Sequence, residues 1–168
     1  MGRWRPPPPE SSPHITPAGF RALQLELDGL WAKRRDVTRH LAAAAAEGDR
    51  SENAEYIYRK KELREIDRRI RYLQKRLPEL QIVNAPPANR HQVFFGASVT
   101  LESETGVENR YRIVGADEFN PGRNWISIDS PLARALLRKT MGEDVIVTTP
   151  AGKTCYSIID VSYHSAED

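Results

Sequence analysis

The chain of 168 residues has one cysteine, four scattered histidines and no long apolar run. The lone Cys155 excludes an internal disulfide, and the histidines form no cluster typical of a structural zinc site. A membrane-spanning helix needs about 18 or more consecutive apolar residues, and the N-terminus lacks the apolar stretch of a signal peptide. We therefore expect a cytoplasmic protein without a membrane partner, held together by packing alone.

Aromatic residues are also few, at 8% of the chain, whereas charged residues make up 29% and hydrophobic residues 39%. This is more charge than a compact domain needs, and it indicates at least one elongated element with much surface. At roughly 150 residues per domain, the length predicts one or two small domains and excludes a large multidomain enzyme.

The net charge of +2 is unevenly divided along the chain. Residues 1–89 contain 17 Lys and Arg against 12 Asp and Glu, whereas residues 90–168 contain 8 against 11. The first part is therefore basic, at +5, and the second acidic, at −3. A basic segment attracts nucleic acid or an acidic protein surface, although its charge alone does not identify the partner.

The basic part begins with a proline-rich tail and continues with two helical patterns. The run Pro6–Pro9 cannot enter a helix or a sheet, so we expect residues 1–13 to be disordered. Thr16 is a suitable N-cap and Pro17 suits the first helical position, which predicts a helix from Pro17 to Glu47. We assign residues 14–84 to a helical segment, 85–91 to a linker and 92–168 to a second domain.

Both helices carry the heptad pattern of a coiled coil. Only a turn at Gly48–Ser51 separates them, so the helices must run antiparallel as a hairpin. Arg34 and Arg59 interrupt the pattern, and Pro78 is expected to end or kink the second helix. The apolar positions are Phe20, Leu23, Leu27, Leu30, Val37, Leu41 and Ala44 in the first helix and Tyr56, Leu63, Ile66, Ile70, Leu73, Leu77 and Leu80 in the second.

Two carboxylates, Asp49 and Glu52, lie at the turn of the hairpin, and two interpretations remain open. Asp49 can be the N-cap of the second helix with Glu52 bonding back from position N3, as in a capping box. Alternatively, the two carboxylates project outward and hold Mg²⁺ together with ligands from a partner, because two carboxylates do not fill an octahedral shell.

The second helix carries a strong excess of positive charge between Asn53 and Arg76, with nine Lys and Arg against four Asp and Glu. A solvated face with i,i+4 ion pairs explains such a helix without any ligand. The nearby Tyr56 and Tyr58 favour nucleic acid instead, because aromatic rings stack on bases while cations contact phosphates.

After the linker, the pattern predicts a small α+β domain with a single helix. In that helix Ser130 is the N-cap and Pro131 the first residue, and Cys155 is expected to pack inside the domain rather than to react. The predicted strands are Val93–Phe95, Ser98–Leu101, Arg110–Val114, Trp125–Ile128, Asp144–Thr148 and Tyr156–Ile159.

Three segments, Gly48–Tyr56, Lys61–Leu73 and Ile126–Leu137, resemble the bacterial transcript-cleavage factors of the Gre family, most closely the GreB type. The similarity extends over about residues 15–164. It implies an N-terminal antiparallel coiled-coil hairpin followed by a domain similar to the FKBP fold. That likeness does not imply prolyl isomerase activity, because function belongs to sites and not to folds.

The resemblance also implies a function in transcription elongation. The hairpin would enter the secondary channel of bacterial RNA polymerase, where Asp49 and Glu52 would help to hold a catalytic Mg²⁺ and stimulate the polymerase to cleave backtracked RNA. The protein would thus activate another enzyme without being one, and a monomer is expected. The alternative is a channel-binding modulator or inhibitor that does not stimulate cleavage.

The remaining site residues follow from the same resemblance. The 3′ end of the nascent RNA would lie in the channel beside the basic helix, and the domain would dock on the polymerase at one corner. The candidates for RNA contact are Arg59, Lys60, Lys61 and Arg64, and those for docking are Asp129, Ser130 and Pro131.

Overall fold

A computed structural model describes residues 9–47 and 53–164 of the chain. Contacts divide the chain into two compact units, one within Met1–Gly19 and Gln81–Asp168 and the other within Phe20–Leu80. None of the helices in the described part is long and apolar enough to cross a membrane. Of the tail predicted over residues 1–13, residues 1–8 lie outside the described residues, as does the whole predicted turn at residues 48–51.

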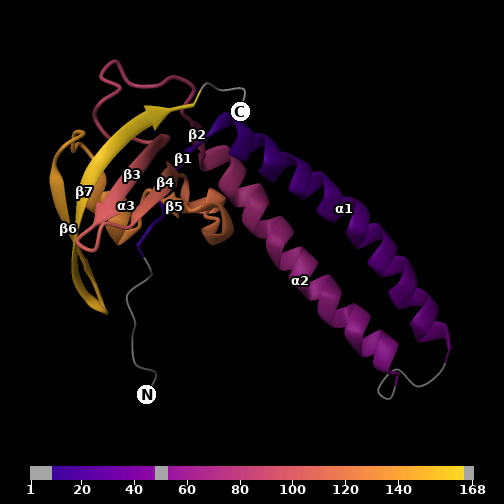
Figure 1. The fold of residues 1–168 in the computed structure, drawn as a ribbon. Helices are drawn as coiled ribbons and strands as arrows, with labels where there is room; N and C mark the ends of the chain where they lie inside the picture. The colour runs from indigo at the N-terminus through magenta and orange to yellow at the C-terminus, as the bar shows by residue number, and fades with distance from the viewer. Residues whose placement is uncertain (1–8, 48–52, 165–168) are drawn as a thin grey trace, which may run out of the picture. The chain divides into compact units, whose positions relative to one another are not determined.

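The helical unit contains two long helices that lie side by side (Figure 1). Helix α1 spans Pro17–Ala46 and α2 spans Ala54–Arg76, followed by a short 3₁₀ helix over Leu77–Glu79. Both predicted helices are confirmed, and α2 ends directly before the turn that contains Pro78. One buried cluster of the unit contains Val37, Ile66 and Ile70, with Leu27, Leu30 and Leu63 packed against them, as the heptad pattern predicts.

The two arginines that interrupt the heptads are held by ion pairs. The Nε atom of Arg34 on α1 lies 2.7 Å from Oδ1 of Asp67 on α2, and Nη1 of Arg59 lies 3.1 Å from Oε2 of Glu62. Each charge at these positions thus has a carboxylate beside it, which lowers the cost of removing it from water. The interruptions are compatible with a continuous helix pair.

The other unit contains a five-stranded sheet in the order β5-β4-β3-β7-β6. All neighbours are antiparallel except β4 and β5, which are parallel. The short helix α3 packs on one face of the sheet through Ala133 and Leu136, which belong to the same buried core as Val99, Leu101 and Ile113. The strands are β3 Ala97–Ser103, β4 Glu108–Val114, β5 Trp125–Ser127, β6 Asp144–Thr149 and β7 Gly152–Tyr163, and α3 spans Pro131–Leu136.

These elements confirm the predicted α+β class and five of the six predicted strands. The prediction of a strand at Val93–Phe95 is wrong. Val93 is fully buried, but its backbone bonds to a turn: its N–H donates to the carbonyl of Lys139, and the N–H of Arg138 donates to the carbonyl of Val93. The apolar residues at this position reflect burial rather than strand pairing.

A second, two-stranded sheet was not predicted. β1 (His14–Ile15) pairs in parallel with β2 (Gln81–Ile82). Ile15 is fully buried, and the N–H of Val83 donates to its carbonyl. The chain segments on either side of the helical unit are therefore joined by backbone hydrogen bonds. The domain boundaries proposed above remain a prediction.

Candidate functional site

The described end of the hairpin is organised by one side chain, that of Asn53. Asn53 is the N-cap of α2, and its Oδ1 accepts hydrogen bonds from the N–H groups of Glu55 at 3.0 Å and Tyr56 at 3.2 Å. Its Nδ2 donates to the carbonyl of Ala44, in the last turn of α1, at 3.0 Å. One amide thus both starts α2 and joins it to the end of α1.

The position of this cap excludes one of the two interpretations of Asp49 and Glu52, the one in which they cap α2. Helix α2 begins at Ala54 and is capped by Asn53, so the prediction that Asp49 is its N-cap, with Glu52 at position N3, is wrong. Asp49 and Glu52 themselves lie outside the described residues.

Ion pairs join α1 and α2 along their length. The guanidinium of Arg69 contacts both carboxylate oxygens of Glu26, at 2.6 and 2.9 Å. Nearer the tip, Lys33 pairs with Glu62 at 3.3 Å. Glu26 on α1 and Glu62 on α2 each pair with a cation of the other helix. These carboxylates therefore help to hold the two helices together.

The pKa of Glu62 shows the balance at one of these pairs. Partial burial raises the pKa of this carboxyl group, but hydrogen bonds from Lys33 and Arg59 and their positive charges lower it more strongly. The net pKa of Glu62 therefore lies below its ordinary value, and the carboxylate stays ionised at neutral pH.

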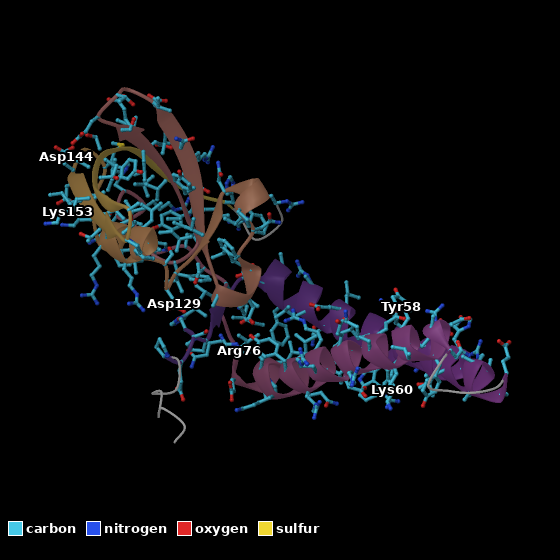
Figure 2. All side chains as sticks on the ribbon, turned by 90° about the horizontal axis from the view of Figure 1, so that it is seen from below. Tyr58, Lys60, Arg76, Asp129, Asp144 and Lys153 are labelled. Atoms are coloured by element: carbon cyan, nitrogen blue, oxygen red, sulfur yellow. The ribbon has the colours of Figure 1, made fainter. Side chains whose placement is uncertain are left out.

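The four predicted RNA-contacting residues differ in their surroundings. Arg59 is half-buried and lies beside Glu62 at 3.1 Å and Glu55 at 3.8 Å, so its guanidinium is already occupied. Lys60, Lys61 and Arg64 are exposed, and the ammonium of Lys60 lies 5.9 Å from the ring centre of Tyr56. Figure 2 shows Lys60 and Tyr58 on this part of the hairpin.

Exposed cations continue along α2 beyond Arg64 and form a longer row. We call this row the basic stripe, and it consists of Lys60, Arg64, Arg68, Arg71 and Lys75. Spacings of three and four residues place them on one face of α2, and the fifteen steps from residue 60 to residue 75, at a rise of 1.5 Å each, make the stripe about 22 Å long. None of the five forms an ion pair with a carboxylate of the described residues. The spacing alone was enough to find the last three members, which were not among the predicted contacts.

The predicted docking corner lies at the start of α3. The Ser130 hydroxyl accepts from the N–H of Ala133 at 3.2 Å, and Pro131 is the first helical residue, so their predicted local roles are confirmed. The Oδ2 atom of Asp129 accepts from the N–H of Ser12 at 2.8 Å. The end of the N-terminal tail therefore lies on this corner, a contact that the sequence did not reveal.

One carboxylate that was not predicted from the sequence, that of Glu118, binds Thr16, the residue before α1. Glu118 accepts hydrogen bonds from the N–H of Thr16, from its hydroxyl and from the N–H of Gly115. A Cβ atom at Gly19 would lie 2.1 Å from a carboxylate oxygen of Glu118, and one at Gly115 would lie 2.3 Å from the carbonyl oxygen of His14. Both glycines are therefore needed for close approach.

Within residues 9–47 and 53–164, no three His, Cys, Asp or Glu side chains are grouped so that they could hold a metal ion. The only metal ligands predicted from the sequence were Asp49 and Glu52. The described residues thus add no further candidate to that pair.

Comparisons with known proteins identify the family. Residues 14–82 match the family model "Transcription elongation factor, N-terminal", and residues 88–163 match "Transcription elongation factor, GreA/GreB, C-term". The chain is 58% identical to transcription elongation factor GreB of Xanthomonas axonopodis pv. citri, over 98% of this chain and 99% of that protein. It is 53% identical to the GreB of Pseudomonas aeruginosa, over 99% of each.

Among solved structures, GreA factor homolog 1 of Thermus thermophilus is similar at 24% identity and a TM-score of 0.42, over 88% of this chain and 97% of that chain, which is too low for a structural conclusion. The family models and the relatives cover nearly the whole chain. The chain therefore belongs to the GreA/GreB family of transcription elongation factors, and within it to the GreB type.

Proposed function

We propose that this protein binds bacterial RNA polymerase, places its hairpin in the secondary channel and stimulates the polymerase to cleave its own backtracked RNA. The observation that supports this most directly is the hairpin itself. Its two helices are joined by a segment with two carboxylates, and Asn53 ties the ends of both helices together. At a 1.5 Å rise, the 30 residues of α1 extend about 45 Å.

In this proposal the tip acts in the active site of the polymerase. Asp49 and Glu52 offer hard carboxylate oxygens, the ligand type that Mg²⁺ prefers, and Asn53 already provides the cap that α2 requires. A bound Mg²⁺ would help to activate water and stabilise the leaving oxygen of the RNA. The tip supplies two ligands and needs the polymerase for the others, so the protein is an activator and not itself a nuclease.

The basic stripe gives the extruded RNA a place beside the hairpin. Its exposed cations would contact phosphates of the RNA 3′ segment without reading its sequence. Lys60, Lys61 and Arg64 are nearest the tip and are our candidates for the first contacts. We assign Arg59 a supporting role, because Glu55 and Glu62 already engage its guanidinium.

The corner of Asp129, Ser130 and Pro131 is our candidate for docking on the polymerase. Ser130 caps α3 and Pro131 is its first residue, so the docking candidates lie at the start of that helix. We further propose that the protein acts as a monomer in the cytoplasm, where its polymerase partner works.

The proposal is tested with a stalled, backtracked polymerase complex that carries labelled RNA. We expect the wild-type protein to accelerate cleavage and the variant Asp49→Asn with Glu52→Gln to lose this effect while its affinity for polymerase stays nearly unchanged. The control is Glu47→Gln with Glu55→Gln, which removes the same charge beside the tip and should still accelerate cleavage.

Other outcomes would contradict parts of the proposal. If the double amide variant lost polymerase binding together with cleavage, the tip acids would have a structural role. If the wild-type protein bound polymerase without accelerating cleavage, it would be a channel-binding modulator instead.

A further inference from the structure

A second basic surface lies on the sheet and contains none of the site residues assigned above. We call it the arginine face. It consists of Arg110 and Arg112 on β4, Arg123 in the turn before β5, Trp125 on β5, and His164 after β7. Arg110 and Arg112 are two residues apart on one strand and so share a face of the sheet. The strand register places Arg112 opposite Trp125 on one side and Ser98 on the other.

The arginines of this face are held in place by uncharged groups. The guanidinium carbons of Arg112 and Arg123 lie 5.2 and 5.1 Å from the ring centre of Trp125, a distance typical of cation–π contacts. The Nη2 atom of Arg110 donates to the hydroxyl of Ser162 at 2.9 Å. These contacts position the side chains without an ion pair, although Asp160 on β7 shares the register partner Thr100 with Arg110.

No carboxylate of the described residues forms an ion pair with Arg110, Arg112 or Arg123. The Nε atom of Arg112 is buried and has no hydrogen-bond partner among the described residues. An unsatisfied buried donor destabilises the fold, so packing alone does not account for an arginine at this position. The cost is explained if Arg112 serves the site by holding the ring of Trp125, against which the guanidinium of Arg123 also lies.

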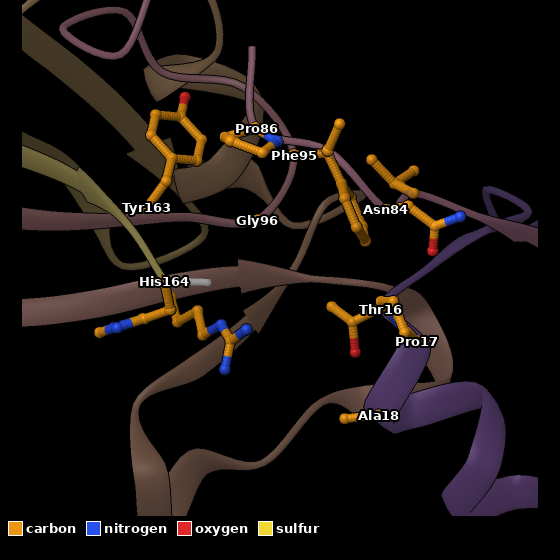
Figure 3. A pocket seen from close by; sticks show the side chains of 12 residues that line it. Thr16, Pro17, Ala18, Asn84, Pro86, Phe95, Gly96, Tyr163 and His164 are labelled. Atoms are coloured by element: carbon orange, nitrogen blue, oxygen red, sulfur yellow. The ribbon is translucent and has the colours of Figure 1, made fainter. Parts of the chain in front are cut away.

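The surface is also hollowed. A broad depression of about 620 Å³ is lined by the three arginines together with Ser98, Trp125 and His164. A smaller hollow of about 50 Å³ adjoins it and shares Arg112 and His164. Figure 3 shows Thr16, Phe95 and His164 around this smaller hollow. The arginine face therefore offers an open concave surface that a flexible chain can enter.

The lining indicates the class of ligand. Among the described residues it contains three arginines and no carboxylate, together with the rings of Tyr111 and Trp125. Arginines without an ion pair beside an aromatic ring are typical of surfaces that follow a single-stranded nucleic acid. Glu102 and Glu108, paired at the other end of the same strands, would repel phosphates and so limit the surface to its basic end.

We propose that the arginine face is a binding site for the phosphate backbone of single-stranded nucleic acid, separate from the basic stripe of the hairpin and independent of polymerase. Arg110 and Arg123, which are exposed, contact phosphates directly. Arg112 and Trp125 hold the guanidinium groups in position. Since only the backbone is contacted, the site binds without sequence preference.

The test measures fluorescence anisotropy of a labelled single-stranded RNA of about 12 nucleotides, a length within the range that such surfaces cover. The full-length chain is used in the background Lys60→Gln, Arg64→Gln, Arg68→Gln, Arg71→Gln and Lys75→Gln, which removes the charges of the basic stripe. In this background, Arg110→Gln with Arg123→Gln should weaken RNA binding roughly tenfold and reduce the salt slope of log K by about 1.4.

The matched control is Arg90→Gln with Lys153→Gln, two exposed cations of the same unit outside the arginine face. This control should change RNA binding less than twofold, and circular dichroism melting should show that both variants are folded. An equal loss of RNA binding in both variants would overturn the proposal, because it would show a general charge effect.

A competition experiment separates the proposal from its nearest rival. If polyglutamate displaced the RNA more effectively than an unlabelled RNA of equal charge, the face would be a site for acidic peptides and the proposal would be wrong. Because polymerase is absent from these measurements, their outcome is independent of the cleavage experiment.

Discussion

The side-chain amide of Asn53 donates a 3.0 Å hydrogen bond to the carbonyl of Ala44, so the N-cap of α2 holds the last turn of α1. The same amide caps α2 through its oxygen. Capping and joining are therefore separate functions of two atoms of one side chain, and substitutions can separate them.

We predict that Asn53→Ser retains the cap but loses the bond to Ala44, because serine is a good N-cap with no donor long enough to reach that carbonyl. The variant should melt close to wild type, yet stimulate cleavage several-fold less, since the segment with Asp49 and Glu52 loses one of its anchors. Asn53→Ala should in addition lose about 1 kcal/mol of stability. Unchanged cleavage by Asn53→Ser would show that the bond to Ala44 does not position the tip.

The Glu62 carboxylate gives a prediction for pH dependence. Its pKa is lowered in the folded state, so it contributes stability above its unfolded pKa of roughly 4.3 and loses that contribution as the pH falls through the lowered folded pKa. Glu62→Gln should therefore be less stable than wild type at pH 7, and the difference should disappear in strong acid.

The measurement is urea unfolding of the hairpin, followed by circular dichroism at neutral and acidic pH. Glu65→Gln serves as the control, because Glu65 is exposed on the same helix and should have little effect at either pH. A difference for Glu62→Gln that persisted below the lowered pKa would mean that shape rather than charge is lost.

The basic stripe predicts a requirement for charge on one face of α2. Arg64→Gln with Arg68→Gln should raise the protein concentration needed for half-maximal RNA cleavage several-fold, and this effect should shrink at high salt, since phosphate contacts weaken with ionic strength. The control is Arg21→Gln with Arg35→Gln, two exposed cations of α1. Equal effects of the two pairs would argue for long-range attraction instead of a stripe.

Local patterns account for the parts of this fold that the sequence predicted. The heptads identified the positions of Val37, Ile66 and Ile70, because each turn of a helix repeats the same contact. The N-cap of α2 was harder to predict. Asp49 and Asn53 are both good N-cap residues, and the sequence does not indicate which of them precedes the helix. In the structure Asn53 is the cap, because its Oδ1 accepts from the N–H groups of Glu55 and Tyr56.

Other features depend on residues far apart in the chain. β1 and β2 have two residues each, which is too few to show a periodicity. In the sequence they are separated by all the residues of the helical unit. Val93 looked like part of a strand because it is apolar, but its partners lie at residues 138–139. The arginine face likewise depends on strand register, since Arg112 meets Trp125 only through the parallel pairing of β4 and β5.

The carboxylate of Glu118 leads to the last prediction, because its partners are 102 residues away at Thr16 and three away at Gly115. Thr16 and Gly115 are buried, so Glu118→Ala leaves donors unpaired that water does not easily reach. Each such donor costs about 1–3 kcal/mol, and we expect a loss of about 3 kcal/mol in unfolding free energy.

Glu143→Ala is the matched control. Glu143 accepts from both the N–H and the hydroxyl of a threonine, Thr140, but is exposed. This variant should therefore lose about 1 kcal/mol or less in unfolding free energy. Equal losses in thermal or urea unfolding would show that the number of hydrogen bonds, and not their burial, determines the contribution of each carboxylate.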